Sequence, residues 1–209
     1  MYAQPSWQPW TISHVVDAAD FPAFALRTYI EQADVRAYLQ RITTDSAIQF
    51  ACEIGCGYGR MIVVLGEFAK EVVGFERQPE FVAVARRLYP RITFHQVQRL
   101  GQLPVPDESF DLVFSFTFLQ HLTDNSLGPA LAEIKRVLRP GGFVLLCEDT
   151  NAATPFGDVT DEHGICVVGR SVEAYANLLF PLRFLASSRR RVEPTCPHKD
   201  VGHYMLFQR

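Results

Sequence analysis

The residues best suited to chemistry stand where two predicted strands end. Three glycines, at positions 55, 57 and 59, follow the apolar run 48–52, and Glu76 closes a second apolar run at 71–75. Glycine lets a backbone turn sharply and pass close to a ligand, because no Cβ stands in the way. A carboxylate at the end of the next strand is placed to accept hydrogen bonds from a ribose diol. This pairing predicts a nucleoside-binding site in an α/β fold.

The spacing of the glycines narrows the ligand. A dinucleotide-binding turn has the pattern G-x-G-x-x-G, and Arg60 stands where its third glycine belongs. Glu53, which opens the motif Glu-Ile-Gly-Cys-Gly-Tyr-Gly, would repel a pyrophosphate and attract an ammonium group. The turn is therefore expected to bind a nucleoside that also carries an ammonium group.

Strand-like and helix-like patterns alternate from Ala47 onward, which is typical of a parallel sheet with helices on both faces. Strands are expected at 48–54, 71–76, 92–97, 110–116, 143–147, 183–192 and 202–208, and helices at 60–68, 79–88, 127–138 and 171–179. The fold class is a Rossmann-like, doubly wound, mostly parallel seven-stranded sheet with an antiparallel C-terminal strand pair. Residues 1–45, helical from about residue 22, form an N-terminal cap, and residues 46–209 form the ligand-binding domain of one compact unit.

The amino-acid composition indicates which binding partners and which cellular compartment to expect. The chain has 209 residues, of which 48% are hydrophobic, which is enough for a core without disulfide or metal. A net charge of −3 disfavours nucleic acid and anionic membranes as partners, and no apolar run is long enough to span a membrane. Five cysteines without a C-x-x-C pair indicate reduced thiols and a cytoplasmic protein. Residues 158–166 match no zinc or calcium spacing, so no metal is expected.

Four motifs in this order resemble the class I S-adenosylmethionine-dependent methyltransferases of the small-molecule type (methyltransferase domain 11 or 25). They are Glu53–Gly59, then Glu76, then Leu103–Val113 (Leu-Pro-Val-Pro-Asp-Glu-Ser-Phe-Asp-Leu-Val), then Arg136–Gly142 (Arg-Val-Leu-Arg-Pro-Gly-Gly). The resemblance covers about residues 48–149. It implies a methyltransferase with S-adenosylmethionine as cofactor and S-adenosylhomocysteine as product.

The resemblance also implies which residues bind the donor. Gly55, Gly57 and Gly59 would line its methionine and ribose portions, and Glu76 would hold the ribose hydroxyls. Glu53 belongs to the same cofactor site, as the acid that suits an ammonium group. The glycine turn is therefore the predicted centre of the donor site.

The adenine end and the methyl end of the donor have further predicted contacts. Arg77 would lie against the adenine. Many relatives carry an acid before the Leu-Pro pair that bonds the adenine amino group, but Arg99 stands there, which leaves the backbone of Leu100 to bind the adenine. Ser115 and Phe116, just past the fourth strand, would contact the donor's amino-acid end and face the acceptor, although core packing is the alternative for Phe116.

A general base is needed only if the acceptor atom is protonated. Candidates stand where strand ends should converge: His121, Glu148, Asp149 and, in the loop beyond, His163. The alternatives are a structural or donor-side role for His121, a turn cap for Asp149 and a solvated loop position for His163. Sequence leaves both interpretations of each residue open.

The acceptor is expected to be a small molecule. Base-modifying relatives usually carry an Asn/Asp-Pro-Pro-aromatic motif after the fourth strand or a Pro-Cys pair, whereas this chain has Ser115-Phe116-Thr117-Phe118 and no Pro-Cys. The run Arg189–Arg191 fits the charged face of an exposed edge strand better than a nucleic-acid site. The alternatives are a homologue that binds the donor without transfer, or another group transfer on the same fold. Monomer and homodimer both remain open.

Overall fold

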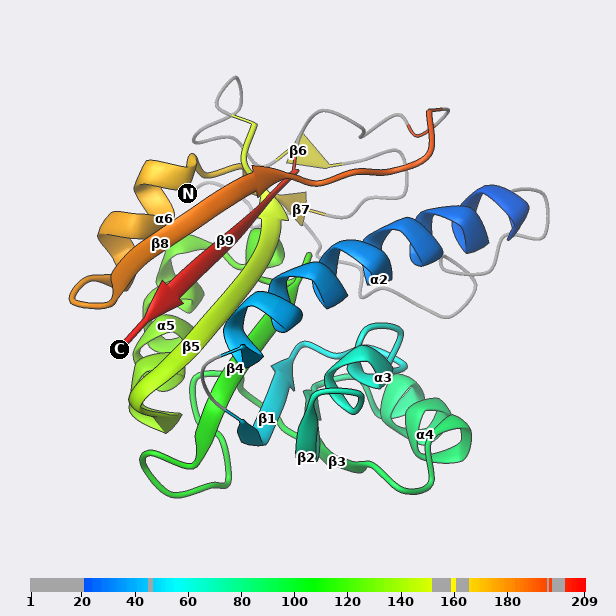
Figure 1. Ribbon diagram of the computed structural model, residues 1–209, viewed down its shortest axis with the longest axis horizontal. Coiled ribbons are helices and arrows are strands. Elements are labelled where there is room, and N and C mark those ends of the chain that lie inside the picture. Colours follow the sequence, from blue (N-terminus) through cyan, green and yellow to red (C-terminus); the bar gives the residue numbers. More distant parts are fainter. Residues whose placement is uncertain (1–20, 45–46, 152–158, 161–165, 195, 197–201) are drawn as a thin grey trace, which may run out of the picture.

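The computed structural model describes residues 21–44, 47–151, 159–160, 166–194, 196 and 202–209 (Figure 1). Its strands are β1 (Ile48–Ile54), β2 (Ala69–Glu76), β3 (Thr93–Gln96), β4 (Phe110–Phe116), β5 (Leu138–Asp149), β6 (Val159–Thr160), β7 (Cys166–Val167), β8 (Arg183–Arg189) and β9 (Gly202–Gln208). Its helices are α2 (Phe21–Thr43), α3 (Ile62–Leu65), α4 (Pro79–Leu88), the 3-10 turn η1 (Leu119–His121), α5 (Asp124–Val137) and α6 (Val172–Leu179).

Within these residues, seven strands form one sheet in the order β3-β2-β1-β4-β5-β9-β8. Strands β1 to β5 run parallel, while β9 runs antiparallel to both β5 and β8. The predicted mostly parallel sheet with an antiparallel C-terminal pair is confirmed. The short ladder of β6 and β7 lies apart from this sheet and was not predicted.

The strand order reverses at β1, which has β2 on one side and β4 on the other. In the register, Glu53 lies between Gly74 and Phe114, and Ile54 lies between Phe75 and Ser115. Ligands of open α/β sheets bind outside the carboxyl ends of the strands at such a reversal. The fold therefore brings the ends of β1, β2 and β4 to one edge, where the glycines and Glu76 stand.

Helices cover both faces of the sheet (Figure 1). The face covered by α5 and α6 has a core that includes Leu127, Leu131, Ile134, Tyr175 and Leu179. The opposite face, covered by α2, α3 and α4, has a core that includes Val35, Leu39, Ile62, Leu65, Val82 and Ala85. Because β4 sends Val113 into the first core and Phe114 into the second, its sequence is an almost unbroken apolar run.

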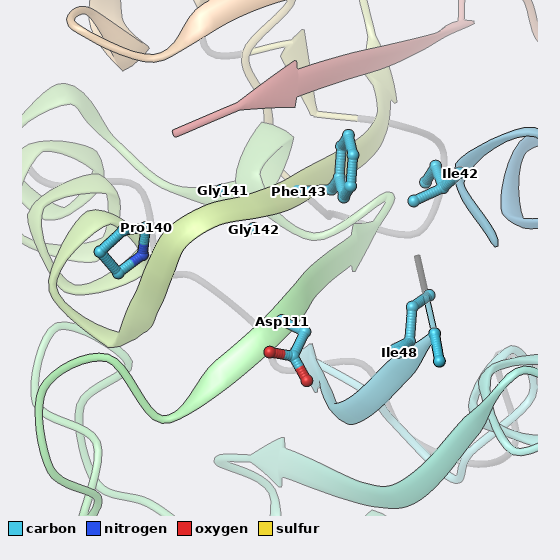
Figure 2. A pocket seen from close by; sticks show the side chains of 8 residues that line it. Ile42, Ile48, Asp111, Pro140, Gly141, Gly142 and Phe143 are labelled. Carbon is cyan, nitrogen blue, oxygen red and sulfur yellow. The ribbon is translucent and has the colours of Figure 1, made fainter. Parts of the chain in front are cut away.

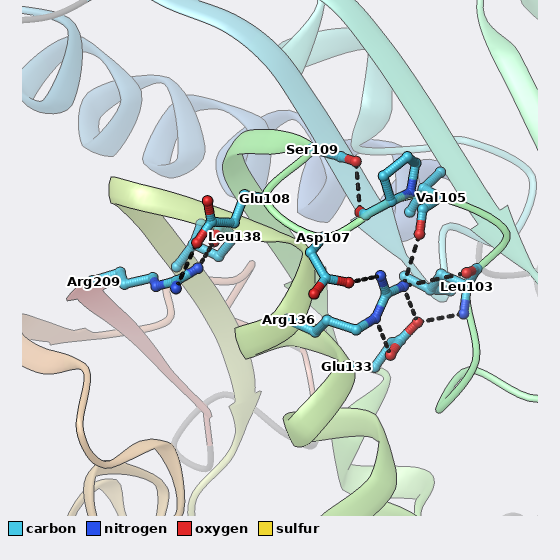
Figure 3. A network of polar contacts seen from close by, with 10 residues as sticks. Leu103, Val105, Asp107, Glu108, Ser109, Glu133, Arg136, Leu138 and Arg209 are labelled. Carbon is cyan, nitrogen blue, oxygen red and sulfur yellow. Dashed lines mark hydrogen bonds and ion pairs between the residues drawn. The ribbon is translucent and has the colours of Figure 1, made fainter.

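One arginine joins the motif at residues 136–142 to the motif at residues 103–113, which leads into β4 (Figure 3). Arg136 of α5 donates to the carboxylates of Glu133 at 2.6 Å and Asp107 at 2.7 Å, and to the carbonyl oxygens of Leu103 and Val105. Glu133 in turn accepts the Leu103 amide at 2.6 Å. These motif residues fix the loop that leads into β4, so their role is to place that strand.

Some predicted boundaries were wrong. The fifth strand, expected at 143–147, begins at Leu138, and Pro140-Gly141-Gly142 forms an irregularity inside it. The helix expected at 60–68 is only the four residues of α3, with turns on either side. The expected cap helix is a single helix, α2. In the described ranges no helix is both long and apolar enough to cross a membrane.

The run of three arginines departs from its predicted role. The edge strand β8 ends at Arg189, and the next two arginines turn toward the cap helix. Arg190 donates to Glu31 at 2.7 Å with a side chain only 12% exposed, and Arg191 donates to Asp34 at 2.7 Å. The interpretation as solvent-exposed edge charge was therefore wrong for Arg190. Sequence could not show this, because the acidic partners are on α2.

Candidate functional site

The glycine turn follows β1 and is fastened to β2. The amides of Gly55 and Cys56 both donate to the Phe75 carbonyl, at 2.8 and 3.1 Å. The φ angles of Gly55, Gly57 and Gly59 are +72°, +54° and +91°, a region that other residues rarely occupy. A Cβ added to Gly57 would meet no atom within 4 Å, so this position faces open space. The turn therefore leaves room for a ligand beside its backbone.

Glu76 lies directly against this turn. Its Oε2 accepts the Gly57 amide at 2.9 Å, and its Oε1 accepts the amides of Arg77 and Gln78 at 2.7 and 2.8 Å. The residue is only 8% exposed, so these bonds hold its carboxylate in place. A carboxylate has about four acceptor positions, of which three are taken, and Oε2 retains one for a hydroxyl group.

Glu53 is a buried acid with an unsatisfied oxygen. It is 2% exposed, and its Oε2 has no hydrogen-bond partner in the part of the chain that the structure describes. Burial raises the pKa of this carboxyl well above its usual value, and nearby Glu76 raises it further, while Arg60 lowers it. Buried acceptors are rarely left without a partner. A ligand cation would satisfy this one.

The exit from β4 forms a wall opposite the glycines. Thr117 has φ +49°, an unusual angle for a β-branched residue, and its amide donates to the Cys147 carbonyl at 2.6 Å. The next residue, Phe118, packs so tightly on the turn that a Cβ at Gly55 would lie 2.2 Å from its ring. No site role was predicted for Phe118, and its position just beyond β4 was the available signal for one.

Glu148 holds the same loop from behind. Glu148 is the last residue but one of β5 and is fully buried. It accepts the Ser115 hydroxyl at 2.8 Å and the Gln120 amide at 3.1 Å, and it also receives hydrogen bonds from the amides of Phe118 and Leu119. Burial raises its pKa to about 7, although these hydrogen bonds lower it. Ser115, which we expected beside the donor, thus directs its hydroxyl toward Glu148.

The buried Glu148 predicts a pH-dependent stability. Its pKa is about 7 in the folded protein, against an ordinary value of 4.5 for a solvated glutamate, so the folded protein keeps a proton that the unfolded chain releases between these values. The unfolding free energy should therefore fall as pH rises through that window, by up to about 3 kcal/mol from this group. Glu148→Gln, which cannot ionise, should show a smaller fall in urea denaturation at about pH 5 and about pH 8.

The control for this comparison is Glu71→Gln, which neutralises an exposed acid on β2. It should keep the pH profile of the unmodified protein. A Glu148→Gln profile that runs parallel to the unmodified one would contradict the assignment.

The candidate bases are placed differently from one another. His121 ends η1, and its amide donates to the Phe118 carbonyl at 3.0 Å. Asp149 accepts the Asn151 amide at 2.8 Å, which is the turn cap considered as its alternative. His163 lies outside the described residues. A catalytic role for any of these three stays a prediction.

The other residues that were predicted to contact the donor differ in how exposed they are. Arg77 and Arg99 are exposed, whereas Leu100 packs in the core beside α5. Phe116 is buried, with the guanidinium carbons of Arg60 and Arg190 at 5.0 and 5.7 Å from its ring centre. The structure therefore brings together the glycine turn, its two acids and the β4 exit, while the contacts of the arginines with a donor stay predictions.

A cavity of about 260 Å³ lies at the opposite edge of the sheet (Figure 2). It is lined by Ile42, Ala47, Ile48, Asp111, Pro140, Gly141, Gly142 and Phe143, at the amino ends of β1 and β4. Asp111 accepts the amides of Gln49 and Phe50, both at 2.9 Å, and a bond from Arg139. These bonds give Asp111 a structural role, and the cavity is away from the ligand-binding edge.

Comparison with known proteins agrees with this geometry. Residues 52–146 match a family described as a methyltransferase domain. A probable S-adenosylmethionine-dependent methyltransferase of Mycolicibacterium smegmatis is 36% identical over 107 residues, which cover 51% of this chain and 40% of that protein. The malonyl-[acyl-carrier protein] O-methyltransferase of Serratia marcescens is 36% identical over 95 residues, which cover 44% and 35%. These matches support a class I S-adenosylmethionine-dependent methyltransferase domain over residues 52–146.

Methyltransferases of this class use S-adenosylmethionine as cofactor, as the motifs implied. The fold agrees: the N-methyltransferase NodS from Bradyrhizobium japonicum, crystallised with S-adenosylhomocysteine, superposes with a TM-score of 0.65 over 84% of this chain and 86% of its own, at 19% identity. The chain spans about two fifths of the length of the curated relatives it matches. The residues that match the family, 52–146, run from within β1 to within β5.

Proposed function

We propose that this chain binds S-adenosylmethionine at the glycine turn and transfers its methyl group to a small-molecule acceptor. The observation that carries the proposal is the buried, unpartnered Oε2 of Glu53 beside a turn whose Gly57 faces open space. An amino acid joined to a nucleoside has the ammonium group and the ribose diol that Glu53 and Glu76 suit. The residues present therefore fit this donor.

The donor supplies an electrophilic methyl group on a sulfonium, and the chain's residues position it. Glu53 binds the ammonium group and Glu76 accepts from the ribose hydroxyls, while Phe118 bounds the space opposite Gly55. Orientation of two reactants can contribute about 7 to 11 kcal/mol to catalysis. Positioning by these residues is therefore the main catalytic contribution that we assign to the chain.

A small-molecule acceptor is supported by the sequence and by one relative. The net charge of −3 and the Ser115-Phe116-Thr117-Phe118 segment disfavour nucleic acid. The Serratia relative is named for O-methylation of malonyl-[acyl-carrier protein], in which the malonyl group is small. We extend to this chain only the size of such an acceptor, and we propose that it acts in the cytoplasm without nucleic acid or membrane partner.

Calorimetry with S-adenosylmethionine, S-adenosylhomocysteine and NAD tests the donor. We expect both sulfur nucleosides to bind and NAD not to bind. Binding of NAD alone would overturn the proposal. Release of S-adenosylhomocysteine with a panel of small acceptors then tests transfer, and donor binding without release across the panel would favour a non-catalytic homologue.

A further inference from the structure

Ion pairs join the cap helix α2 to the segment that follows β8, which runs alongside that helix (Figure 1). Arg27 pairs with Glu193, and Arg191 pairs with Asp34, so each of these arginines has a carboxylate of its own. Glu31, between them on α2, is fully buried and is shared by Arg60 and Arg190. The middle of this ion-pair seam thus has two guanidinium groups for one carboxylate.

The two guanidinium groups are buried but incompletely bonded. The side chains of Arg60 and Arg190 are 17% and 12% exposed. Arg60 uses Nη1, toward Glu31 and Thr28, and Arg190 uses Nε, toward Glu31. Across the described ranges, Nε and Nη2 of Arg60 and both terminal nitrogens of Arg190 meet no acceptor. In the described residues, the fully buried side-chain atoms without a partner do not include these nitrogens, so they reach solvent and can meet a ligand that brings acceptors with it.

Their position is that of an acceptor site rather than of a remote surface site. Both groups lie on the ring of Phe116, which ends β4 beside the end of β1. Arg60 also directly follows the glycine turn and lowers the pKa of Glu53. Once a donor ammonium group pairs with Glu53, Glu31 is the one carboxylate of the described residues that is bonded to the two arginines, while Glu193 near Arg190 is already paired with Arg27. The charge at Phe116 is then positive, directly beside the donor.

We propose that Arg190, assisted by Arg60, binds a carboxylate group of the methyl acceptor. This inference rests on the proposed function, because it places the acceptor beside the donor. The planar guanidinium fork matches a carboxylate with two parallel hydrogen bonds, which a lysine ammonium group cannot reproduce. The substrate class is therefore small carboxylic acids, with the Arg190 end of the site setting their orientation.

Matched acid and amide probes test this assignment. Protein loaded with S-adenosylhomocysteine is titrated with 4-hydroxybenzoate against 4-hydroxybenzamide, and with hexanoate against hexanamide. We expect the acids to bind about 10- to 100-fold more tightly than the amides. Arg190→Gln should reduce this preference to about twofold or less and leave S-adenosylhomocysteine affinity unchanged. Arg190→Lys, which keeps the charge and the pairing with Glu31, should keep only a small part of the preference.

Arg191→Gln is the matched control, since it removes a neighbouring ion pair with the same helix, and it should keep the full preference. Three results would overturn the inference: no acid preference in the unmodified protein, a preference that survives in Arg190→Gln, or a loss of S-adenosylhomocysteine affinity in Arg190→Gln, which would assign the arginine to the donor's own carboxylate. Failure of the unmodified protein to bind either sulfur nucleoside would instead overturn the proposed function, and this inference with it.

Discussion

Replacing Gly57 with valine should weaken S-adenosylmethionine binding by about 100-fold or more, because the new side chain would fill ligand space. No atom of the described residues lies within 4 Å of the position that a Cβ would take, so none of them has to move. The backbone amide that donates to Glu76 is retained. The φ of +54° should still reduce the unfolding free energy, by about 1 to 2 kcal/mol. Calorimetry and urea denaturation measure the two effects separately.

Gly141→Val is a matched control for the backbone strain. Gly141 has φ +79°, and a Cβ added there would also meet no atom within 4 Å, but it lies in β5 at the opposite edge of the sheet. This variant should lose a similar amount of stability while keeping its donor affinity. If Gly57→Val binds the donor as well as Gly141→Val does, the glycine turn is not the donor site.

Replacing Glu53 with glutamine should change stability and binding in opposite directions. The carboxylate is buried with an unpartnered oxygen, so its removal should raise the unfolding free energy at about pH 8 by about 1 to 3 kcal/mol. The same change removes the charge that pairs with the donor's ammonium group. Donor affinity should therefore fall by about 10- to 100-fold. A residue kept for stability alone would not show this opposition.

The size of the stability gain from Glu53→Gln depends on pH. Burial raises the folded-state pKa of Glu53 above 4.5, so the folded protein binds more protons than the unfolded chain above that pH. The unfolding free energy therefore falls as pH rises from 4.5 toward the raised pKa, and it has lost the whole contribution of this group above that pKa. The gain from Glu53→Gln should therefore be larger at about pH 8 than at about pH 5. Glu71→Gln, at an exposed site, should change neither quantity, and unchanged donor affinity in Glu53→Gln would exclude it from the site.

Most of the fold could be predicted because its strands and helices carry local signals in the sequence. Parallel strands buried on both faces must be apolar almost throughout, so β1 and β4 were visible as runs. Local signals placed α4 at Pro79 and α6 at Ser171, whose hydroxyl accepts the Ala174 amide at 3.1 Å. Boundaries failed where long-range pairing decides them, as in β5, which continues through Pro140-Gly141-Gly142 because Leu138 already pairs with Phe110.

The sequence by itself predicted the candidate donor site, because the glycine turn and its acids are local features whose spacing carries their chemistry. Gly57, Glu76 and Glu53 lie together where the spacing put them. Only the tertiary structure decided the burial and the partners of charged groups. Glu31 and Arg190 are separated by 159 residues, and their meeting on Phe116 depends on how α2 and the segment after β8 pack over the sheet. Hydrogen bonding and burial between distant segments leave no periodicity in the chain, so the candidate acceptor end of the site became visible only in the fold.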